Sequence, residues 1–424
     1  MTAAIIAFIL TIIIGVPIAY VLGLTALVYV LTTADISLFA SIPQRMSTAV
    51  QNYGLLAIPL FVFVGELMNS GGITSRLVHF AQVIVGRLRG GLAYVNVLAN
   101  MFLASILGSA NAQSAMMSRV VVPEMEKQGY RKDFSAALTA SSSLLGPIIP
   151  PSLPFIIYGI LAEVSITGMF LAGIIPGICL AAVFAILIFF LSRKYQFPKS
   201  AKSSFNEIVK RFMSVAPALL IPSLIFVGIL SGAFTATESA AVAALIALIV
   251  GAFVYKELKW KDIPQMLMRT AITSSIVTFI VATASMFSWV LALERIPHMI
   301  GQFLIAIAGN EIVFLLLINI LFILVGMVLE GTAAMIILVP ILLPVAIQLG
   351  IDPIQFGIIV CINLTIGLIT PPVGTVLFIT SAASQVSIER LTIQLLPFLI
   401  AAIIVLLLIT YIPPLTLWIP SIFK

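Results

Sequence analysis

The sequence predicts an all-α polytopic membrane protein built from two inverted repeats. Three observations support this prediction: an extreme apolar composition, long continuous hydrophobic segments, and a duplicated pattern of glycine and proline. Of the 424 residues, 62% are hydrophobic and only 8% are charged, whereas soluble domains carry about a quarter charged residues. This composition excludes a soluble enzyme, a disordered chain and a coiled coil, so the solvent of the folded chain is lipid.

The hydrophobic segments are continuous rather than alternating, which favours helices over an outer-membrane β-barrel. Full spans are predicted at 3–31, 51–69, 135–160, 166–191, 214–231, 235–255, 271–293, 354–384 and 394–418. The first of these is long, and Gly15-Val16-Pro17 is a point where it can split. Two further apolar stretches, 91–126 and 312–348, are interrupted in the middle, and each arm is at or below the roughly 17–25 residues needed to cross a bilayer.

Lysine and arginine indicate how the interrupted stretches lie in the membrane. Eighteen of the 21 basic residues fall in segments 70–90, 119–132, 192–213 and 256–269 or at Arg390. Under the positive-inside rule these segments are cytoplasmic. Both ends of 91–126 are then on one side, which predicts a re-entrant hairpin whose tip at 108–111 reaches mid-membrane. Such a backbone is tolerated only where protein or a water-filled cavity covers it.

The second half of the chain repeats the glycine and proline pattern of the first at a spacing of 221 residues, as from Pro123 to Pro344 (344 − 123). The other matches are Gly129 with Gly350, Gly146 with Gly367, Pro150-Pro151 with Pro371-Pro372, and Pro176 with Pro397. One extra crossing, 214–231, joins the units, so the second unit is predicted to be upside down. Two inverted units with opposed broken segments are typical of secondary transporters. A duplication without a transport role is the alternative.

Segments 73–89 and 294–310 also correspond at this spacing. They are predicted to be amphipathic arm helices at the membrane interface that precede each hairpin. Each carries one of the two histidines, His79 and His298. Interfacial packing is the favoured interpretation of these side chains, and proton coupling is the alternative.

Sodium sites are predicted where the helices break. A helix end at mid-membrane exposes free N–H or C=O groups, and carbonyl and hydroxyl oxygens suit Na⁺. Proline also leaves carbonyls of the preceding turn unpaired. Two or more bound Na⁺, with one site in each half, are therefore predicted at Gly108, Ser109, Asn111, Pro150, Gly331, Thr332, Thr370 and Pro371. The alternative is that these breaks are only kinks, with Ser and Thr hydroxyls bonded back to the helix.

The same breaks suit a small carboxylate substrate, because free N–H groups and hydroxyls bind anions. The candidate substrate-binding residues are Ser114, Ser142, Asn363, Arg295 and Glu330. For Arg295 the role of an interfacial anchor is equally open. Glu330 is a buried and therefore costly acid, which can face a cation or a helix N-terminus. Glu238 fits a capping box that begins a helix, and Glu66 is a weaker candidate.

No catalytic residue is predicted. The chain lacks a phosphate-binding loop and a His-Glu-x-x-His motif. Its two cysteines, Cys179 and Cys361, both lie inside apolar segments. We therefore expect no enzyme activity, no organic cofactor, no metal other than sodium and no nucleic-acid partner.

Several strings are similar to those of one transporter family. They are GSANAQSA (108–115), GPIIPPS (146–152), GAFTATESAAVAA (232–244), LEGTAAM (329–335) and GLITPPVGTVLF (367–378). With them the chain resembles, over essentially its whole length, the large membrane subunit of tripartite ATP-independent periplasmic (TRAP) transporters. The resemblance implies a bacterial inner-membrane, Na⁺-coupled importer of organic anions that works by an elevator motion. Sialic acid and C4-dicarboxylates are among the substrates it implies, and the overall likeness favours the sialic-acid branch.

The resemblance also implies two protein partners, a small four-helix membrane subunit and a periplasmic substrate-binding protein. No four-helix extension precedes Met1, so we expect the small subunit to be a separate chain. The implied moving domain comprises 91–160 and 312–384, and the scaffold comprises 1–90, 161–311 and 385–424. A stand-alone Na⁺-coupled dicarboxylate or anion symporter is the alternative. A channel is a rival from another class, although no ring of like charges or filter motif supports it.

Overall fold

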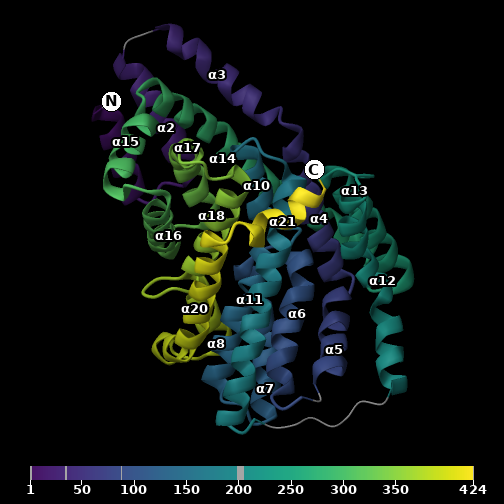
Figure 1. Cartoon of the computed structure of the whole chain (residues 1–424). Coiled ribbons are helices and arrows are strands. Elements are labelled where there is room, and N and C mark those ends of the chain that lie inside the picture. The colour runs from purple at the N-terminus through teal and green to yellow at the C-terminus, as the bar shows by residue number, and fades with distance from the viewer. Residues whose placement is uncertain (1, 34–35, 87, 198–204, 424) are drawn as a thin grey trace.

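The fold is helical throughout the part of the chain that the structure, a computed structural model, describes: residues 2–33, 36–86, 88–197 and 205–423. Within these ranges, eight helices are long and apolar enough to cross a membrane, or nine with the bent pair Lys132–Ile148 and Leu153–Leu161. The helices pack alongside one another in one body (Figure 1). The predicted all-α polytopic membrane fold is confirmed.

The N-terminal segment differs from the predicted single span over 3–31. It forms two helices, α1 (Thr2–Ile13) and α2 (Ile18–Thr33), that pack against each other. Gly15 has a φ of +81°, which favours glycine, and Pro17 has no N–H to donate, so the first helix ends there. An unpredicted helix, α3 (Ile36–Val50), lies across one end of the molecule at the top of Figure 1.

The first repeat unit contains the predicted elements in the predicted order. They are η1 (Tyr53–Leu56), α4 (Ala57–Ser70), the arm helix α5 (Ile73–Val85), the hairpin α6 (Gly91–Leu107) and α7 (Ala110–Lys127), the broken span α8 (Lys132–Ser142), α9 (Leu145–Ile148) and α10 (Leu153–Leu161), and α11 (Ile166–Lys194). The broken span bends by 42° where GPIIPPS interrupts it.

The joining helix α12 (Phe205–Leu230) leads to the second unit. Its elements are α13 (Ala236–Ile249), the π-helix η2 (Val250–Val254), η3 (Trp260–Asp262), α14 (Ile263–Leu293), the arm helix α15 (Ile296–Ala308), the hairpin α16 (Glu311–Val328) and α17 (Gly331–Gln348), the broken span α18 (Pro353–Gly367) and α19 (Thr375–Ser384), α20 (Ile388–Tyr411) and α21 (Pro414–Ile422). The predicted span 394–418 ends early, at Tyr411, because Pro413 and Pro414 follow it.

The two units match in backbone detail. The turn after α7 and the turn after α17 make the same hydrogen bonds: the N–H of Tyr130 reaches the carbonyl of Met125, and that of Ile351 reaches Ala346, each at 3.0 Å. This is the Schellman motif, and it places a glycine in the left-handed conformation at the same point of each turn. The arm helices α5 and α15 lie at opposite ends of the molecule in Figure 1, as inverted units require.

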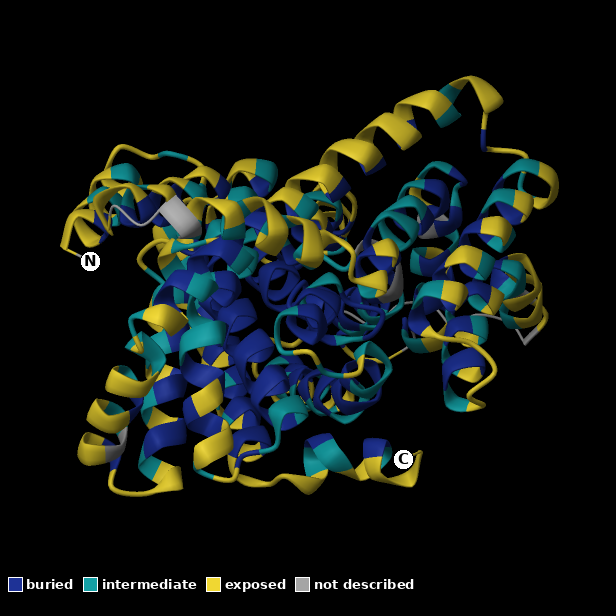
Figure 2. Cartoon of the chain, turned by 90° about the horizontal axis from the view of Figure 1, so that it is seen from above, coloured by how far each residue is buried: buried dark blue, intermediate teal, exposed yellow. Residues whose placement is uncertain are grey.

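Buried residues gather in the middle of the molecule and exposed ones surround them (Figure 2). Many exposed residues are large and apolar; Phe190 and Val227, for example, are 62% and 63% exposed. In water such a surface would favour aggregation, whereas in a bilayer it faces lipid at no cost.

Candidate functional site

The two hairpin tips meet at one small cavity of 90 Å³, which we call the inter-tip cavity. The first tip contributes Gly108–Asn111 and the second contributes Glu330–Thr332. Pro147, Leu153 and Pro154 from the first broken span and Cys361, Leu364, Thr365 and Leu368 from the second complete the described lining with Met335. Residues more than 200 positions apart in the chain thus surround a single space.

The first tip is shaped by Gly108 and Ser109. Gly108 has a φ of +55°, which ends α6, and Ser109 is extended and begins α7. The Oγ of Ser109 accepts a hydrogen bond from the N–H of Ala112 at 3.5 Å. Asn111 is held from the second unit, because the Oγ1 of Thr375 donates to its Oδ1 at 3.0 Å. The N-terminus of α7, with its partial positive charge, therefore faces the inter-tip cavity.

The second tip uses a carboxylate where the first uses a hydroxyl. Glu330 caps α17, since its Oε2 accepts from the N–H of Ala333 at 3.1 Å. The N–H of Gly374 donates to the carbonyl of Met327 at 3.1 Å and ties the end of α16 to the second break. Of the two roles left open for Glu330, the structure supports the interaction with a helix N-terminus.

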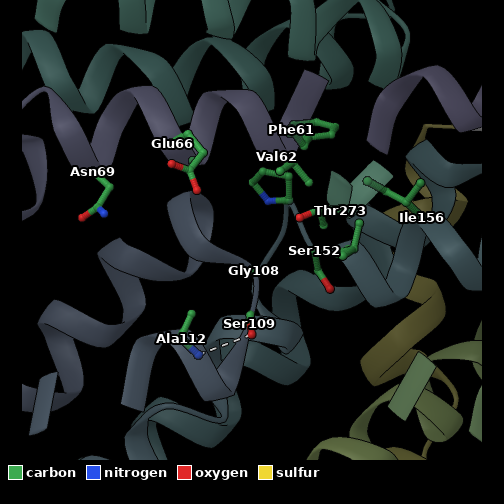
Figure 3. Close-up of a pocket in the computed structure, with 13 residues that line it drawn as sticks. Phe61, Val62, Glu66, Asn69, Gly108, Ser109, Ala112, Ser152, Ile156 and Thr273 are labelled. Atoms are coloured by element: carbon green, nitrogen blue, oxygen red, sulfur yellow. Dashed lines mark hydrogen bonds between the residues drawn. The ribbon is translucent and has the colours of Figure 1, made fainter. Parts of the chain in front are cut away.

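A larger cavity of 370 Å³, the inner cavity, lies on the other side of the first tip (Figure 3). Gly108 and Ser109 line it as well, so the first tip separates the two spaces. Its remaining walls come from α4 and α14, including Glu66, Asn69 and Thr273, and from the first broken span, including Pro151 and Ser152. Glu66 also pairs with Arg269, with 3.4 Å between Oε2 and Nη1.

Six of the predicted site residues line these cavities: Gly108, Ser109, Asn111, Glu330, Gly331 and Thr332. The others lie apart from the two linings. Pro150 is buried and Pro371 is partly buried, and each lies in the break of its span. The Oγ1 of Thr370 donates to the carbonyl of Ile366 in the preceding turn at 2.8 Å. That back-bond is the local arrangement that the kink interpretation expects.

The remaining predicted substrate residues are buried in helix packing or exposed at the surface. Ser114 lies 2.6 Å from the Oγ1 of Thr380, and Asn363 donates to the Oδ1 of Asn319 at 2.7 Å. Ser142 is buried, and its hydroxyl has no hydrogen-bond partner among the described residues. Arg295 is exposed in the turn between α14 and α15 with a φ of +54° and lines neither cavity.

Apart from Asn363, sequence reasoning missed a network of buried amides in each unit. In the first unit Asn96 donates to Thr139 at 2.7 Å, Asn100 to Asn96 at 2.8 Å, and Gln113 to the carbonyl of Asn100 at 2.5 Å. In the second unit the corresponding group is Asn319, Gln355, Asn363 and Thr410. An amide inside an apolar span is the signal that marks these residues, because burying it without a partner is costly.

The chain matches the family described as "Tripartite ATP-independent periplasmic transporter, DctM component" over residues 5–415. It belongs to this family. The sialic acid TRAP transporter large permease protein SiaM of Vibrio cholerae is 37% identical over 96% of both chains. The C4-dicarboxylate TRAP transporter large permease protein DctM of Rhodobacter capsulatus is 32% identical, again over 96% of both chains. These relatives are transporter permeases rather than enzymes, and the family resemblance read from the sequence strings is confirmed.

A third relative, the 2,3-diketo-L-gulonate TRAP transporter large permease protein YiaN of Escherichia coli, is 37% identical over 95% of this chain and 94% of its own. Among solved structures, the YdaH transporter of Alcanivorax borkumensis aligns with a TM-score of 0.64 and 18% identity, covering 92% of this chain and 90% of that one. At this identity the likeness shows the fold alone.

The chemistry at the tips of this TRAP large permease is that of oxygen atoms, including the carboxylate of Glu330, and helix N-termini. Among the described residues, no group of three His, Cys, Asp or Glu side chains is placed to hold a metal. Several buried oxygens have no hydrogen-bond partner within the described part of the chain, including Asn100 Oδ1, Gln113 Oε1 and Asn363 Oδ1. Gln113 Oε1 lies against Gly146, whose Cβ, if present, would be only 2.1 Å away. Oxygen donors of this kind fit an alkali cation, and the N–H groups of the helix ends fit an anion.

Proposed function

We propose that this chain is the large membrane subunit of a Na⁺-coupled importer that takes up a small organic anion across a bacterial inner membrane. The observation that carries the proposal is the convergence of two opposed hairpin tips on one cavity. A cavity bounded by helix ends from inverted units is the arrangement that secondary transporters use to bind ion and solute together.

The substrate is a carboxylate that binds at the first tip. The inner cavity is large enough for a small ligand at 370 Å³, and the N-terminus of α7 offers N–H groups and the hydroxyl of Ser109 to an anion. The relatives named for sialic acid, 2,3-diketo-L-gulonate and C4-dicarboxylates are named for carboxylates. Sialic acid or a C4-dicarboxylate is the substrate class proposed for this chain.

Sodium binds beside each tip, with one site per unit. In the first unit the donors are the oxygens of Ser109 and Asn111 with the carbonyls before Pro150. In the second unit they are Thr332 and the carbonyls near Thr370 and Pro371. These donors are not among the unsatisfied buried side-chain oxygens; support comes from two other buried oxygens, Gln113 Oε1 in the first unit and Asn363 Oδ1 in the second, which no described residue satisfies. Two cations would offset the charge of Glu330 and of the substrate, which gives each ligand a reason to favour the other.

Transport proceeds by an elevator motion in which 91–160 and 312–384 move against the remaining spans. The loaded part crosses because its charges are paired, whereas a half-loaded part carries an uncompensated charge into the membrane. A small membrane subunit and a periplasmic binding protein complete the transporter, as the family name and the relatives' description as large permeases suggest. A stand-alone symporter, the alternative expected from the sequence, is the outcome against which the proposal is tested.

Reconstitution of the full complex into proteoliposomes tests the proposal. Radiolabelled sialic acid and succinate are offered with an inward Na⁺ gradient, with and without the binding protein. We expect uptake of one of them only when both the gradient and the binding protein are present. Uptake that needs the gradient but not the binding protein supports the stand-alone symporter. Uptake that is unchanged without the gradient, or none across a panel of carboxylates, refutes the proposal.

A further inference from the structure

A third cavity, of 710 Å³, lies at the opposite end of the membrane-spanning part from the cytoplasmic basic segments. We call it the outer cavity. Its walls are α3 and α14 on one side and, on the other, the end of α10 and part of α17. The broken span of the first repeat unit and the hairpin of the second therefore both border it.

The outer cavity and the inner cavity lie along the same two helices. On α14, Thr273 lines the inner cavity, and Ser285 and Ser288 line the outer one. An α-helix rises 1.5 Å per residue, so Thr273 and Ser285 are about 18 Å apart along the axis. On α10, Ile156 lines the inner cavity and Ile160 the outer one. The two cavities thus follow one another along α14 and α10.

The outer cavity holds an arginine where basic residues are scarce. Only Arg45, Arg295 and Lys424 fall outside the basic cytoplasmic segments and Arg390. Arg45 lines the outer cavity and Arg295 does not. The guanidinium of Arg45 lies 5.9 Å from the ring centre of Trp289, and no described carboxylate comes within 4.0 Å of it.

Arg45 is exposed at the cavity, and the groups around it are polar. The Oγ of Ser285 donates to the carbonyl of Arg45 at 3.4 Å, which joins α3 to α14. Thr48, Asn52 and Ser288 add hydroxyl and amide groups to the walls. One carboxylate, Glu163, lines the cavity, and its φ of +54° places it in the left-handed turn that ends α10.

We propose that the outer cavity is a capture site for a small carboxylate, in which Arg45 binds the carboxylate with two parallel hydrogen bonds. Its planar guanidinium matches a carboxylate in this way, and an ion pair within a partly enclosed space is worth more than one in open water. The hydroxyls of Ser285 and Ser288 bind the rest of the solute. Glu163 repels the bound anion and so weakens its binding. The anion then passes along α14 and α10 to the first tip instead of remaining in the outer cavity. The identity of the anion rests on the proposed function.

Two measurements on the full complex in proteoliposomes test the capture site. The first is uptake of labelled sialic acid and succinate at limiting and saturating concentration. The second is labelling of Ser288→Cys by a membrane-impermeant thiol reagent, with and without each anion. The unsubstituted chain sets the labelling background, because Cys179 and Cys361 lie within membrane-spanning helices. Gln44→Ala is the matched control, since Gln44 is exposed on the same helix beside Arg45 but does not line the cavity.

We expect Arg45→Ala to lower uptake at limiting substrate about tenfold while uptake at saturating substrate stays within about twofold. Arg45→Ala should also abolish protection of Ser288→Cys by the anion, whereas Arg45→Lys keeps part of it and Glu163→Gln increases it. Unchanged protection and uptake in Arg45→Ala, with sodium-dependent uptake intact, overturn the capture site and leave the proposed function standing. If the anion protects Ser288→Cys only when Arg45 is present, but uptake does not depend on sodium, the capture site stands and the proposed function is refuted. If Gln44→Ala loses as much uptake as Arg45→Ala, the capture site is also overturned, because the loss then comes from a disturbance of α3 and not from removal of the guanidinium.

Discussion

Ser109 and Glu330 stand at equivalent points of the two units and perform the same local task with different chemistry. Each caps the helix that begins at its hairpin tip, one with a hydroxyl and the other with a carboxylate. A cap satisfies backbone N–H groups that the helix leaves free, and its loss costs about 1 kcal/mol. Equivalent positions of the two repeat units therefore both cap a helix. The chemical type of each capping side chain determines what else that side chain can bind.

Bulky apolar residues at the tips test the proposed ion sites. We expect Ser109→Leu and Thr332→Leu each to reduce Na⁺-dependent uptake to background, because leucine removes an oxygen donor and fills space at the inter-tip cavity. The cost to folding should stay near the cap value of about 1 kcal/mol for Ser109→Leu, and Thr332→Leu removes no cap, because Glu330 caps α17; expression and melting temperature should therefore change little. Ser223→Leu, at an exposed position of α12, is the control. Normal uptake in both tip variants would contradict the proposed sites.

The residue-level predictions from sequence succeeded where a local rule applies. The capping box of Thr235 and Glu238 is confirmed, with hydrogen bonds of 2.8 Å and 3.2 Å between each side chain and the other backbone N–H. Six tip residues lie at the cavities, and their roles in binding sodium and substrate stay predictions. The bond from Thr375 to Asn111 joins the two units, and no spacing within either unit specifies it.

At the scale of elements, the backbones of α16 and α18 approach each other closely in the second unit. A Cβ added to Gly367 would lie 2.7 Å from the Cα of Gly326 and 2.5 Å from its carbonyl carbon. Two helices can approach this closely only where both lack side chains, and the contact fixes the second hairpin against the second broken span.

We expect Gly367→Ala to destabilise the protein by about 1–3 kcal/mol, because overpacking must shift a backbone rather than a side chain. The melting temperature of the detergent-solubilised protein measures the effect. Gly23→Ala is the control: it lies in α2, and its added Cβ would meet Thr283 at an ordinary 3.4 Å. Equal melting temperatures for the two variants would show that α16 and α18 adjust freely.

Contact between the units runs through α7 and α19. Thr380 donates its proton to the carbonyl of Val376 at 2.7 Å, so Ser114 is the donor in the 2.6 Å contact between the two hydroxyls. We expect Ser114→Ala and Thr380→Val each to cost about 1 kcal/mol, and the double variant to cost less than their sum. Thermal unfolding of the four proteins measures the coupling, and strict additivity would exclude a shared bond.

Element boundaries show what the sequence specifies and what it leaves open. The hairpins and broken spans follow from Gly, Pro and the distribution of Lys and Arg, and their predicted limits agree with α6–α10 and α16–α19 to within a few residues. The split of 3–31 at Gly15-Val16-Pro17 is an alternative to one span that the sequence leaves open, whereas the surface helix α3 and the early end of α20 were not predicted. Hydrophobicity measures only whether a segment prefers lipid, and it is nearly the same for one long helix and two short ones.

At the scale of the whole molecule, the arrangement of cavities along α14 bears on motion. The inner cavity and the outer cavity lie at different heights along α14. Of these two cavities, the first tip borders only the inner one. An elevator motion predicts that the first tip moves from the inner cavity to the outer cavity. The expected displacement is comparable with the distance of about 18 Å along α14 between Thr273 and Ser285.

Cysteine accessibility in proteoliposomes tests that exchange. Ala112 lines the inner cavity beside the first tip, so we expect Ala112→Cys to react with an impermeant reagent applied from the cytoplasmic side. With Na⁺ and substrate-loaded binding protein outside, a fraction should react from the outer side. Thr273→Cys on α14 is the control, because it belongs to the scaffold and should keep its cytoplasmic access. Reaction of Ala112→Cys from one side under all conditions would rule out the elevator motion.

The unlike caps also give the inter-tip cavity a polarity. One of its ends carries a neutral hydroxyl over a helix N-terminus, and the other carries a full negative charge over an equivalent helix end. A cation in this cavity is attracted more strongly to the Glu330 end than to the Ser109 end. The two halves therefore share one backbone geometry but differ in charge, so the two proposed sodium sites are not equivalent.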